Sequence, residues 1–126
     1  MSSSRRVFVR LLIAGTAVLA IGTSARAAMH LRLAKSEPAK DAVVAAPTQL
    51  QLWFSLKPAM SITSVKLTSS SDVAVKVGKA AHSGDEKAPV LVAIEEPLAA
   101  GKYTVSWKTA SSDMHPVTGD FSFTVK

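Results

Sequence analysis

Apolar and polar residues alternate along several short stretches of the chain. Between Thr48 and Ser55 this alternation places Leu50, Leu52 and Phe54 on one face. Alternation with a period of two over four to eight residues is typical of a half-buried β-strand. The same pattern recurs in three further stretches, which are Val73–Val77, Tyr103–Trp107 and Phe121–Val125.

Three more stretches complete a set of about seven predicted strands: His30–Lys35, Ile62–Ser69 and Pro89–Glu95. Proline, glycine and serine clusters separate the strands and favour turns. No sustained helical period follows residue 28. Short strands at this spacing predict an all-β domain over residues 28–126. We expect a seven-stranded antiparallel Greek-key barrel or sandwich of the immunoglobulin-like or cupredoxin-like kind.

The N-terminal segment has the three parts of a signal peptide. Basic residues, including the Arg5-Arg6 pair, precede an apolar run from Leu11 to Gly22, and Ala25-Arg26-Ala27 follows as a small-residue cleavage site. The run is too short to span a bilayer. The arginine pair favours a twin-arginine signal, with an ordinary secretory signal as the alternative. We therefore expect residues 1–27 to be removed and the mature protein to be periplasmic, beginning at Ala28.

Composition narrows the function classes. Apolar residues make up 48% of the 126 residues, which predicts a packed core. Four of the fifteen Lys and Arg residues lie before residue 28, so eleven remain against nine acidic residues and the mature net charge is +2. Such a small charge does not predict a nucleic-acid partner. The chain has no cysteine, which excludes disulfides and thiolate metal sites.

The candidate chemistry lies in a segment after the Trp107 strand. Asp113 and His115 are two residues apart, so in an extended segment their side chains point the same way. Pro116 favours an extended conformation at His115. An imidazole and a carboxylate that converge make a half-site for Cu(II) or Zn(II), whereas the alternative is a solvated loop pair. His30, at the start of the mature chain, favours the metal site.

Two blocks of residues carry a resemblance to a known family. The first block is His30-x-x-Leu33-x-x-Ser36-x-Pro38-Ala39, followed by Leu52-x-Phe54-Ser55. The second is Ala100-Gly101-x-Tyr103-x-Val105-x-Trp107, followed by Asp113-x-His115-Pro116-x-x-Gly119-x-Phe121-x-Phe123. Over residues 30–126 the chain resembles the CopC family of periplasmic copper-resistance proteins.

The resemblance implies a Greek-key β-barrel that binds one Cu(II) ion with an early histidine, an aspartate and a late histidine. In this chain those roles fall to His30, Asp113 and His115. It also implies a monomer that takes part in copper homeostasis or resistance, without membrane insertion, and an inner-membrane copper transporter as partner.

This chain departs from the family pattern at the copper ligands. Cleavage before Ala28 would make His30 the third residue rather than the first, so the terminal amine would coordinate copper differently. Leu56 stands where some members have a glutamate ligand. The region that holds a methionine-rich Cu(I) site in other members contains His82 but no methionine, so we expect no Cu(I) site.

The remaining candidates have simpler explanations. His82 is expected to be a solvated loop residue, and Met60 and Met114 are expected to be packing or loop residues. Three function classes stay open. The first is a copper carrier or buffer that is not an enzyme, the second is a copper-dependent oxidase-like enzyme, and the third is an immunoglobulin-like interaction module without metal. Copper titration separates the third class from the others, and turnover with a reductant and oxygen separates the second.

Overall fold

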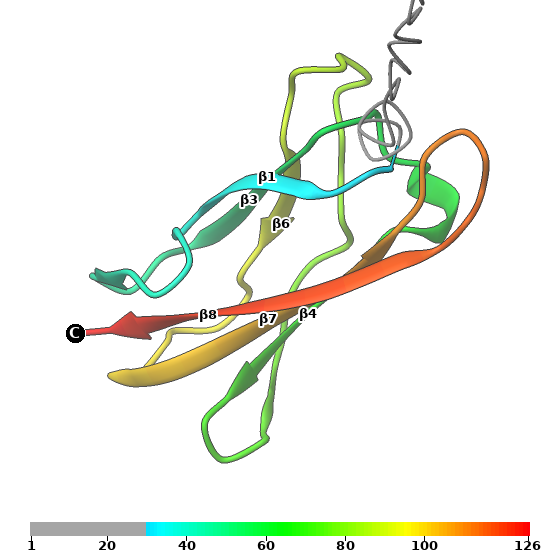
Figure 1. Cartoon of the computed structure of the whole chain (residues 1–126). Coiled ribbons are helices and arrows are strands. Elements are labelled where there is room, and N and C mark those ends of the chain that lie inside the picture. The colour runs from blue at the N-terminus through cyan, green and yellow to red at the C-terminus, as the bar shows by residue number, and fades with distance from the viewer. Residues whose placement is uncertain (1–29) are drawn as a thin grey trace, which may run out of the picture.

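The computed structural model describes residues 30–126, which form two β-sheets in two layers (Figure 1). The predicted signal peptide, residues 1–27, lies outside the described residues. No helix in the described part is both long and apolar enough to cross a membrane. Among residues 30–126 the single helical element is the short 3-10 turn η1 (Met60–Ile62).

The smaller sheet has three strands in the order β1-β3-β6, with bounds β1 (Leu33–Glu37), β3 (Gln49–Phe54) and β6 (Val90–Ala93). The larger sheet has five strands in the order β2-β8-β7-β4-β5. Its bounds are β2 (Val43–Val44), β4 (Ser64–Ser69), β5 (Ala74–Val75), β7 (Gly101–Thr109) and β8 (Val117–Val125).

All seven predicted strands are present, with shifted ends, and the all-β two-sheet fold is confirmed. The structure adds β2, an eighth strand of two residues, and this strand pairs parallel to the end of β8. That parallel pair was not predicted, since two residues carry no readable alternation. The predicted Val73–Val77 strand shrinks to β5, because Val73 lies in the turn that closes the hairpin. Its backbone N–H and C=O both contact Ser69, and its side chain is exposed.

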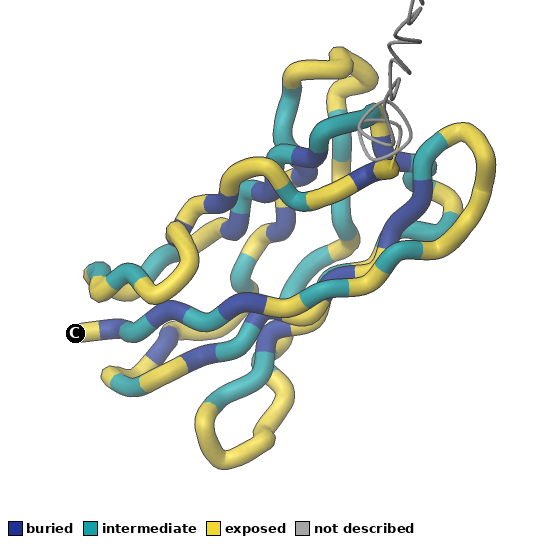
Figure 2. Tube along the Cα trace, viewed as in Figure 1, coloured by how far each residue is buried: buried dark blue, intermediate teal, exposed yellow. Residues whose placement is uncertain are grey.

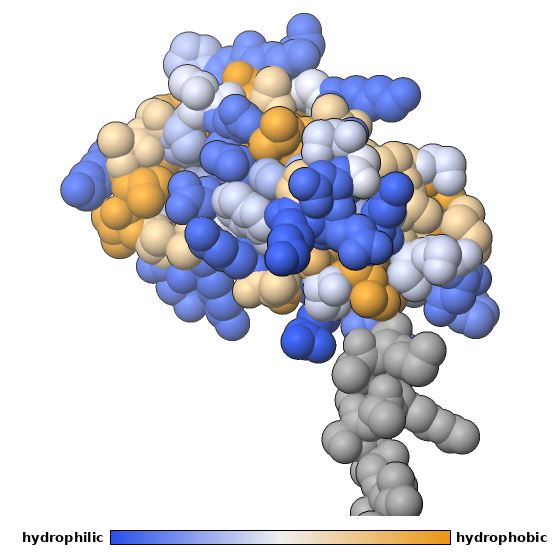
Figure 3. All heavy atoms as spheres, turned by 90° about the horizontal axis from the view of Figure 1, so that it is seen from above, coloured by the Kyte–Doolittle hydropathy of each residue, from blue (hydrophilic) through white to orange (hydrophobic). Residues whose placement is uncertain are grey.

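The core lies between the two sheets, where the buried faces of the alternating strands meet (Figure 2). Phe54 of β3 and Trp107 of β7 pack edge to face across the layers, with ring centroids 5.2 Å apart. Three strands, β3, β7 and β8, supply fully or almost fully buried side chains, among them Leu50, Leu52, Val105 and Phe123. The alternation therefore identified the core correctly. Seen from above, the surface is mainly hydrophilic, with small, scattered apolar patches (Figure 3).

The long hairpin of β7 and β8 fixes where the candidate site lies. The two strands pair over nine residues each, from Gly101 opposite Val125 to Thr109 opposite Val117. Tyr103 anchors the start of the hairpin by donating from its hydroxyl to the carbonyl of Ala99, at 2.8 Å. The other end of the hairpin opens into the β7–β8 loop, residues 110–116. This loop and the start of β1 lie at the same end of the molecule (Figure 1).

Candidate metal centre

The β7–β8 loop is fixed at its first residues by the segment around η1. Thr109 is fully buried, and its hydroxyl is 2.8 Å from that of Thr63. The Ala59 N–H donates to the carbonyl of Ala110 at 2.7 Å. These contacts tie the end of β7 to the η1 segment, so the loop leaves the sheet from a rigid base.

Asp113 organises the loop beyond this base. One carboxylate oxygen, Oδ1, accepts hydrogen bonds from the Ser111 hydroxyl at 2.9 Å and from the His115 N–H at 3.1 Å. The His115 N–H and the Ser111 hydroxyl, in this order, hold the pKa of the Asp113 carboxyl below its ordinary value. The carboxylate therefore stays charged over the range in which it would meet a metal ion.

The prediction that this segment is extended is wrong. The chain turns here, with Met114 in the left-handed region at φ 60° and its N–H donating to the carbonyl of Ser111 at 3.0 Å. Asp113 caps the turn through its own side chain, which short carboxylates do readily. The two side chains nevertheless converge, because the turn brings Nδ1 of His115 to 3.3 Å from Oδ2 of Asp113. Ser111 is the residue whose role the sequence did not reveal, since a serine in a loop carries no signal of its partner.

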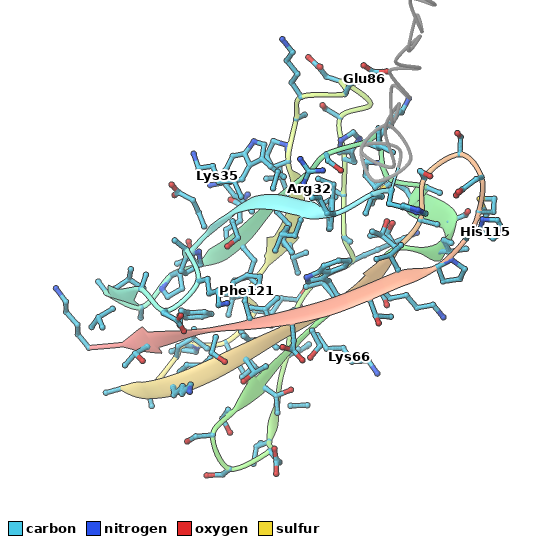
Figure 4. The ribbon with its side chains drawn as sticks, in the orientation of Figure 1. Arg32, Lys35, Lys66, Glu86, His115 and Phe121 are labelled. Carbon is cyan, nitrogen blue, oxygen red and sulfur yellow. The ribbon has the colours of Figure 1, made fainter. Side chains whose placement is uncertain are left out.

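His115 is presented to solvent by this turn (Figure 4). Its side chain is 87% exposed, against 52% for Asp113. Asp113 contacts the Nδ1 atom, which leaves Nε2 as the ring nitrogen that this pair does not use. A histidine held through one nitrogen by a carboxylate is oriented to offer the other to a metal.

His30 is the first described residue, and it is exposed. Its backbone is held by Ser55, the residue after β3, whose hydroxyl donates to the carbonyl of His30 at 3.4 Å and accepts from the Arg32 N–H at 2.9 Å. His30 lies three residues before the start of β1, and β1 starts at the end of the molecule that carries the β7–β8 loop (Figure 1). Within residues 30–126, no three His, Asp or Glu side chains are grouped closely enough to hold a metal. The structure therefore brings Asp113 and His115 together and leaves His30 at the same end but outside their contact.

The other residues considered from the sequence have distinct positions. His82 is half-buried rather than solvated, and both of its ring nitrogens contact backbone groups. Met60 packs against the core and Met114 is 49% exposed in the loop, so the prediction that they are packing or loop residues is confirmed. Leu56 lies beside the β7–β8 loop in a hollow of about 430 Å³ that Ser111, Ser112 and Glu86 also line.

Comparison with known proteins gives consistent matches. Residues 33–126 match the family model of the CopC domain. Copper resistance protein C of Escherichia coli is 39% identical over 118 residues, covering 88% of this chain and 93% of that protein. Copper resistance protein C of Pseudomonas syringae pv. tomato is 35% identical over 130 residues, covering 98% of each chain.

Two solved structures share the fold. The crystal structure of PcoC, a methionine-rich copper resistance protein from Escherichia coli, superposes with a TM-score of 0.69 at 39% identity. The superposition covers 77% of this chain and 99% of the PcoC chain. The crystal structure of CopC from Methylosinus trichosporium OB3b superposes with a TM-score of 0.70 at 28% identity, covering 77% of this chain and 94% of that one.

Proposed function

Because this chain belongs to the CopC family, as its motifs predicted, we propose that it binds copper outside the cytoplasm and carries or buffers one Cu(II) ion. The observation that carries the proposal is the Asp113–His115 pair, held on a rigid base in the loop that shares one end of the molecule with the start of β1. The ion is the cargo of the protein rather than a resident catalytic group. Its relatives are named for copper resistance.

The proposed ligands are His30, Asp113 and His115. Imidazole nitrogen and carboxylate oxygen suit Cu(II), which favours tetragonal nitrogen and oxygen donors. Oδ1 of Asp113 keeps its two hydrogen bonds within the loop, so Oδ2 is the proposed ligand oxygen, and it exchanges its 3.3 Å contact with Nδ1 of His115 for the ion when the His115 side chain rotates. The left-handed backbone of Met114 supports this assignment. Non-glycine residues rarely occupy that region, and those that do cluster at functional sites.

Binding also requires His30 to approach the Asp113–His115 pair. His30 is the first described residue. Its backbone carbonyl accepts from the Ser55 hydroxyl, just after β3, and this contact leaves the His30 side chain unused. A small rotation of this side chain and of His115 is a low-cost motion for exposed residues. We propose that copper itself draws the three side chains together.

We propose that the protein has one tight Cu(II) site and no tight Cu(I) site. Cu(I) prefers soft thioether and thiolate ligands. The Escherichia coli structure is described as methionine-rich, whereas this chain has four methionines, of which Met60 and Met114 are the two in the described part. Met60 packs against the core, so it is not free to bind an ion at the surface.

The wider setting of the proposal concerns residues outside the described part. We propose export to the periplasm and cleavage before Ala28, which leaves Ala28-Met29-His30 as the mature N-terminus. The terminal amine then lies two residues from His30 and can add a further nitrogen donor. We also propose that the mature protein is a monomer that exchanges copper with an inner-membrane transporter, and that it is not an enzyme.

Titration of the secreted, metal-free protein against a competing chelator tests the proposal. We expect one equivalent of Cu(II) to bind tightly, and this binding to weaken in both His30→Ala and His115→Ala but not in His82→Ala. If the unaltered protein binds Cu(II) no more tightly than the His30→Ala/His115→Ala double variant does, the assignment of these ligands is overturned. A Cu(I) titration that reveals a second site of comparable strength would overturn the proposed stoichiometry.

A further inference from the structure

The two sheets leave an open seam between β1 and β8. β1 is the outer strand of the three-stranded sheet, paired only with β3. β8 pairs with β7 along its whole length, but on its other side its only strand partner is β2, at Thr124 and Val125, and the Asp41 N–H donates to the Ser122 carbonyl just before them. The first half of β8 therefore has one unpaired edge, and it borders β1 across the seam (Figure 1).

The unpaired backbone groups of β8 can be identified from its partners. Ser122 accepts from Asp41 through its carbonyl, and Thr124 donates to Ala42 through its N–H, so both residues direct their backbone groups away from β7. Backbone groups alternate along a strand, and Thr118 and Asp120 therefore share this outward direction. Natural proteins usually cover or interrupt such edges, because an exposed edge is a template for another strand.

The seam also forms a groove of about 730 Å³, which we call the seam groove. Its lining residues are 31–37, 39–40, 107 and 117–121. Arg32 and Lys40 lie on its β1 side and Phe121 comes from β8, whereas the Lys35 ammonium, from the same wall, is turned toward Trp53, 4.7 Å from the ring centroid. The groove is therefore bounded by two strand edges and runs along their length, which is the shape that an extended chain requires.

A buried hydrogen-bond donor lies at the β8 wall of this groove. Trp107 is 8% exposed, and its Nε1 is the one buried side-chain nitrogen or oxygen of the described residues that has no hydrogen-bond partner. The indole lies over Gly119, where an added Cβ would be only 2.4 Å from Cζ2 and 3.1 Å from Nε1. Glycine at this position lets the ring reach across β8. A buried donor without a partner costs about 1–3 kcal/mol, so an acceptor entering the groove would be favoured.

The charge of the residues around the seam groove indicates what kind of molecule would bring this hydrogen-bond acceptor. A second hollow shares Trp107, Thr118, Gly119 and Asp120 with the seam groove. The seam groove is lined by three cations, Arg32, Lys35 and Lys40, against Glu37 and Asp120, and the second hollow adds Lys66 and Lys108 with no further acidic residue. This excess of positive charge favours an acidic occupant and disfavours a second copy of the same basic edge.

We propose that the seam groove binds an extended, acidic segment of a partner protein, which adds a strand between β1 and β8. Its backbone pairs with Thr118 and Asp120, and one of its carbonyls accepts from Nε1 of Trp107. Leu31 and Arg32 line the groove next to His30, so the segment ends beside the proposed copper ligands. The proposal does not depend on copper binding, and its test uses metal-free protein.

The probe is the capped hexapeptide Glu-Val-Glu-Val-Glu-Val, added to the ¹⁵N-labelled mature protein at low ionic strength. We expect saturable shifts at the amides of Thr118 and Asp120 and at the Trp107 indole N–H. The matched peptide Lys-Val-Lys-Val-Lys-Val should bind at least about fivefold more weakly. Equal binding of the two peptides, or shifts confined to other residues, would overturn the proposal.

Two variants separate backbone pairing from charge. Thr118→Pro removes one outward N–H and no β7–β8 bond, and it should weaken the acidic peptide about fivefold, whereas Thr118→Val should not. Lys40→Glu should weaken it several-fold, and the same charge change at the exposed Lys102, outside the groove, should not. If both test variants bind like the unaltered protein, no strand is added here. Concentration-dependent shifts at the same amides without peptide would instead identify a second copy as the occupant.

Discussion

Two histidine-bearing loops of this protein use the same side chain in opposite ways. His82, between β5 and β6, is half-buried, and its Nδ1 accepts from the Gly84 N–H at 3.0 Å. Its Nε2 lies 3.1 Å from the carbonyl of Ala88, and because a carbonyl only accepts, that nitrogen is the donor. His115, in the β7–β8 loop, is exposed and has one ring nitrogen on Asp113.

The difference separates a structural histidine from a candidate ligand. Both nitrogens of His82 hold its loop closed, and coordination of a metal would break at least one of these bonds. His115 loses nothing comparable, because its Nε2 is outside the Asp113 contact. We infer that the number of ring nitrogens already used, rather than the presence of a histidine in a loop, distinguishes the two roles.

The largest expected effect is on copper affinity at His115. His115→Ala removes a strong nitrogen donor from an exposed position, so Cu(II) affinity should fall at least about tenfold, or ~1.4 kcal/mol, with little loss of folding stability. Competition titration and urea unfolding measure the two quantities. His82→Ala is the matched control for affinity. Equal losses in the two variants would remove the distinction between the loops.

The next effect is on stability at His82. His82→Ala deletes both contacts that close its loop and should lower the free energy of unfolding by about 1 kcal/mol. Amide exchange at Gly84 should become faster, because its acceptor is gone. Urea unfolding and hydrogen exchange check this. An unchanged Gly84 exchange rate would contradict the structural role of the ring.

A smaller effect is expected at Asp113. Asp113→Asn keeps an oxygen that can accept from the His115 N–H but removes the negative charge. Cu(II) affinity should fall about threefold, less than in His115→Ala, because a neutral acceptor binds a cation more weakly than a charged one. The same competition titration measures it. A loss larger than that of His115→Ala would make the carboxylate the principal ligand.

The smallest effect is a pH dependence of the metal-free protein. The pKa of Asp113 is lowered in the folded state, first by the His115 N–H and then by the Ser111 hydroxyl. The ionised carboxylate therefore favours folding above the pKa of the unfolded chain, and this contribution disappears as pH falls through the folded-state pKa. Carboxyl ¹³C titration should show Asp113 titrating below an ordinary aspartate, and higher in Ser111→Ala. Identical titration in the two proteins would refute the role of Ser111.

The fold was largely predictable because burial in a two-sheet protein follows a period of two. Leu50, Leu52 and Phe54 alternate with polar residues, and all three are buried. The alternation of apolar and polar residues failed to predict the structure in two places. At Val73 a turn replaces the expected strand, and β2 has only two residues, too few to show an alternation.

The site was predictable only in part. The spacing of Asp113 and His115 predicted that their side chains converge, and they do, but through a turn rather than an extended segment. Ser111 and the left-handed Met114 complete that turn, and the turn could not be predicted from these residue types. Likewise, the contacts of His82 come from a backbone N–H and a backbone carbonyl, which a sequence does not display.

The central claim is that His30, Asp113 and His115 form one copper site, and the most direct test counts imidazoles on the bound ion. Pulsed electron paramagnetic resonance of the mature protein with one equivalent of Cu(II) should show couplings from two imidazoles. The His115→Ala variant should show one, and the His82→Ala variant should still show two. If the spectrum of His115→Ala matched that of the unaltered protein, His115 would not be a ligand, and the site would belong to the N-terminal segment ending at His30 alone.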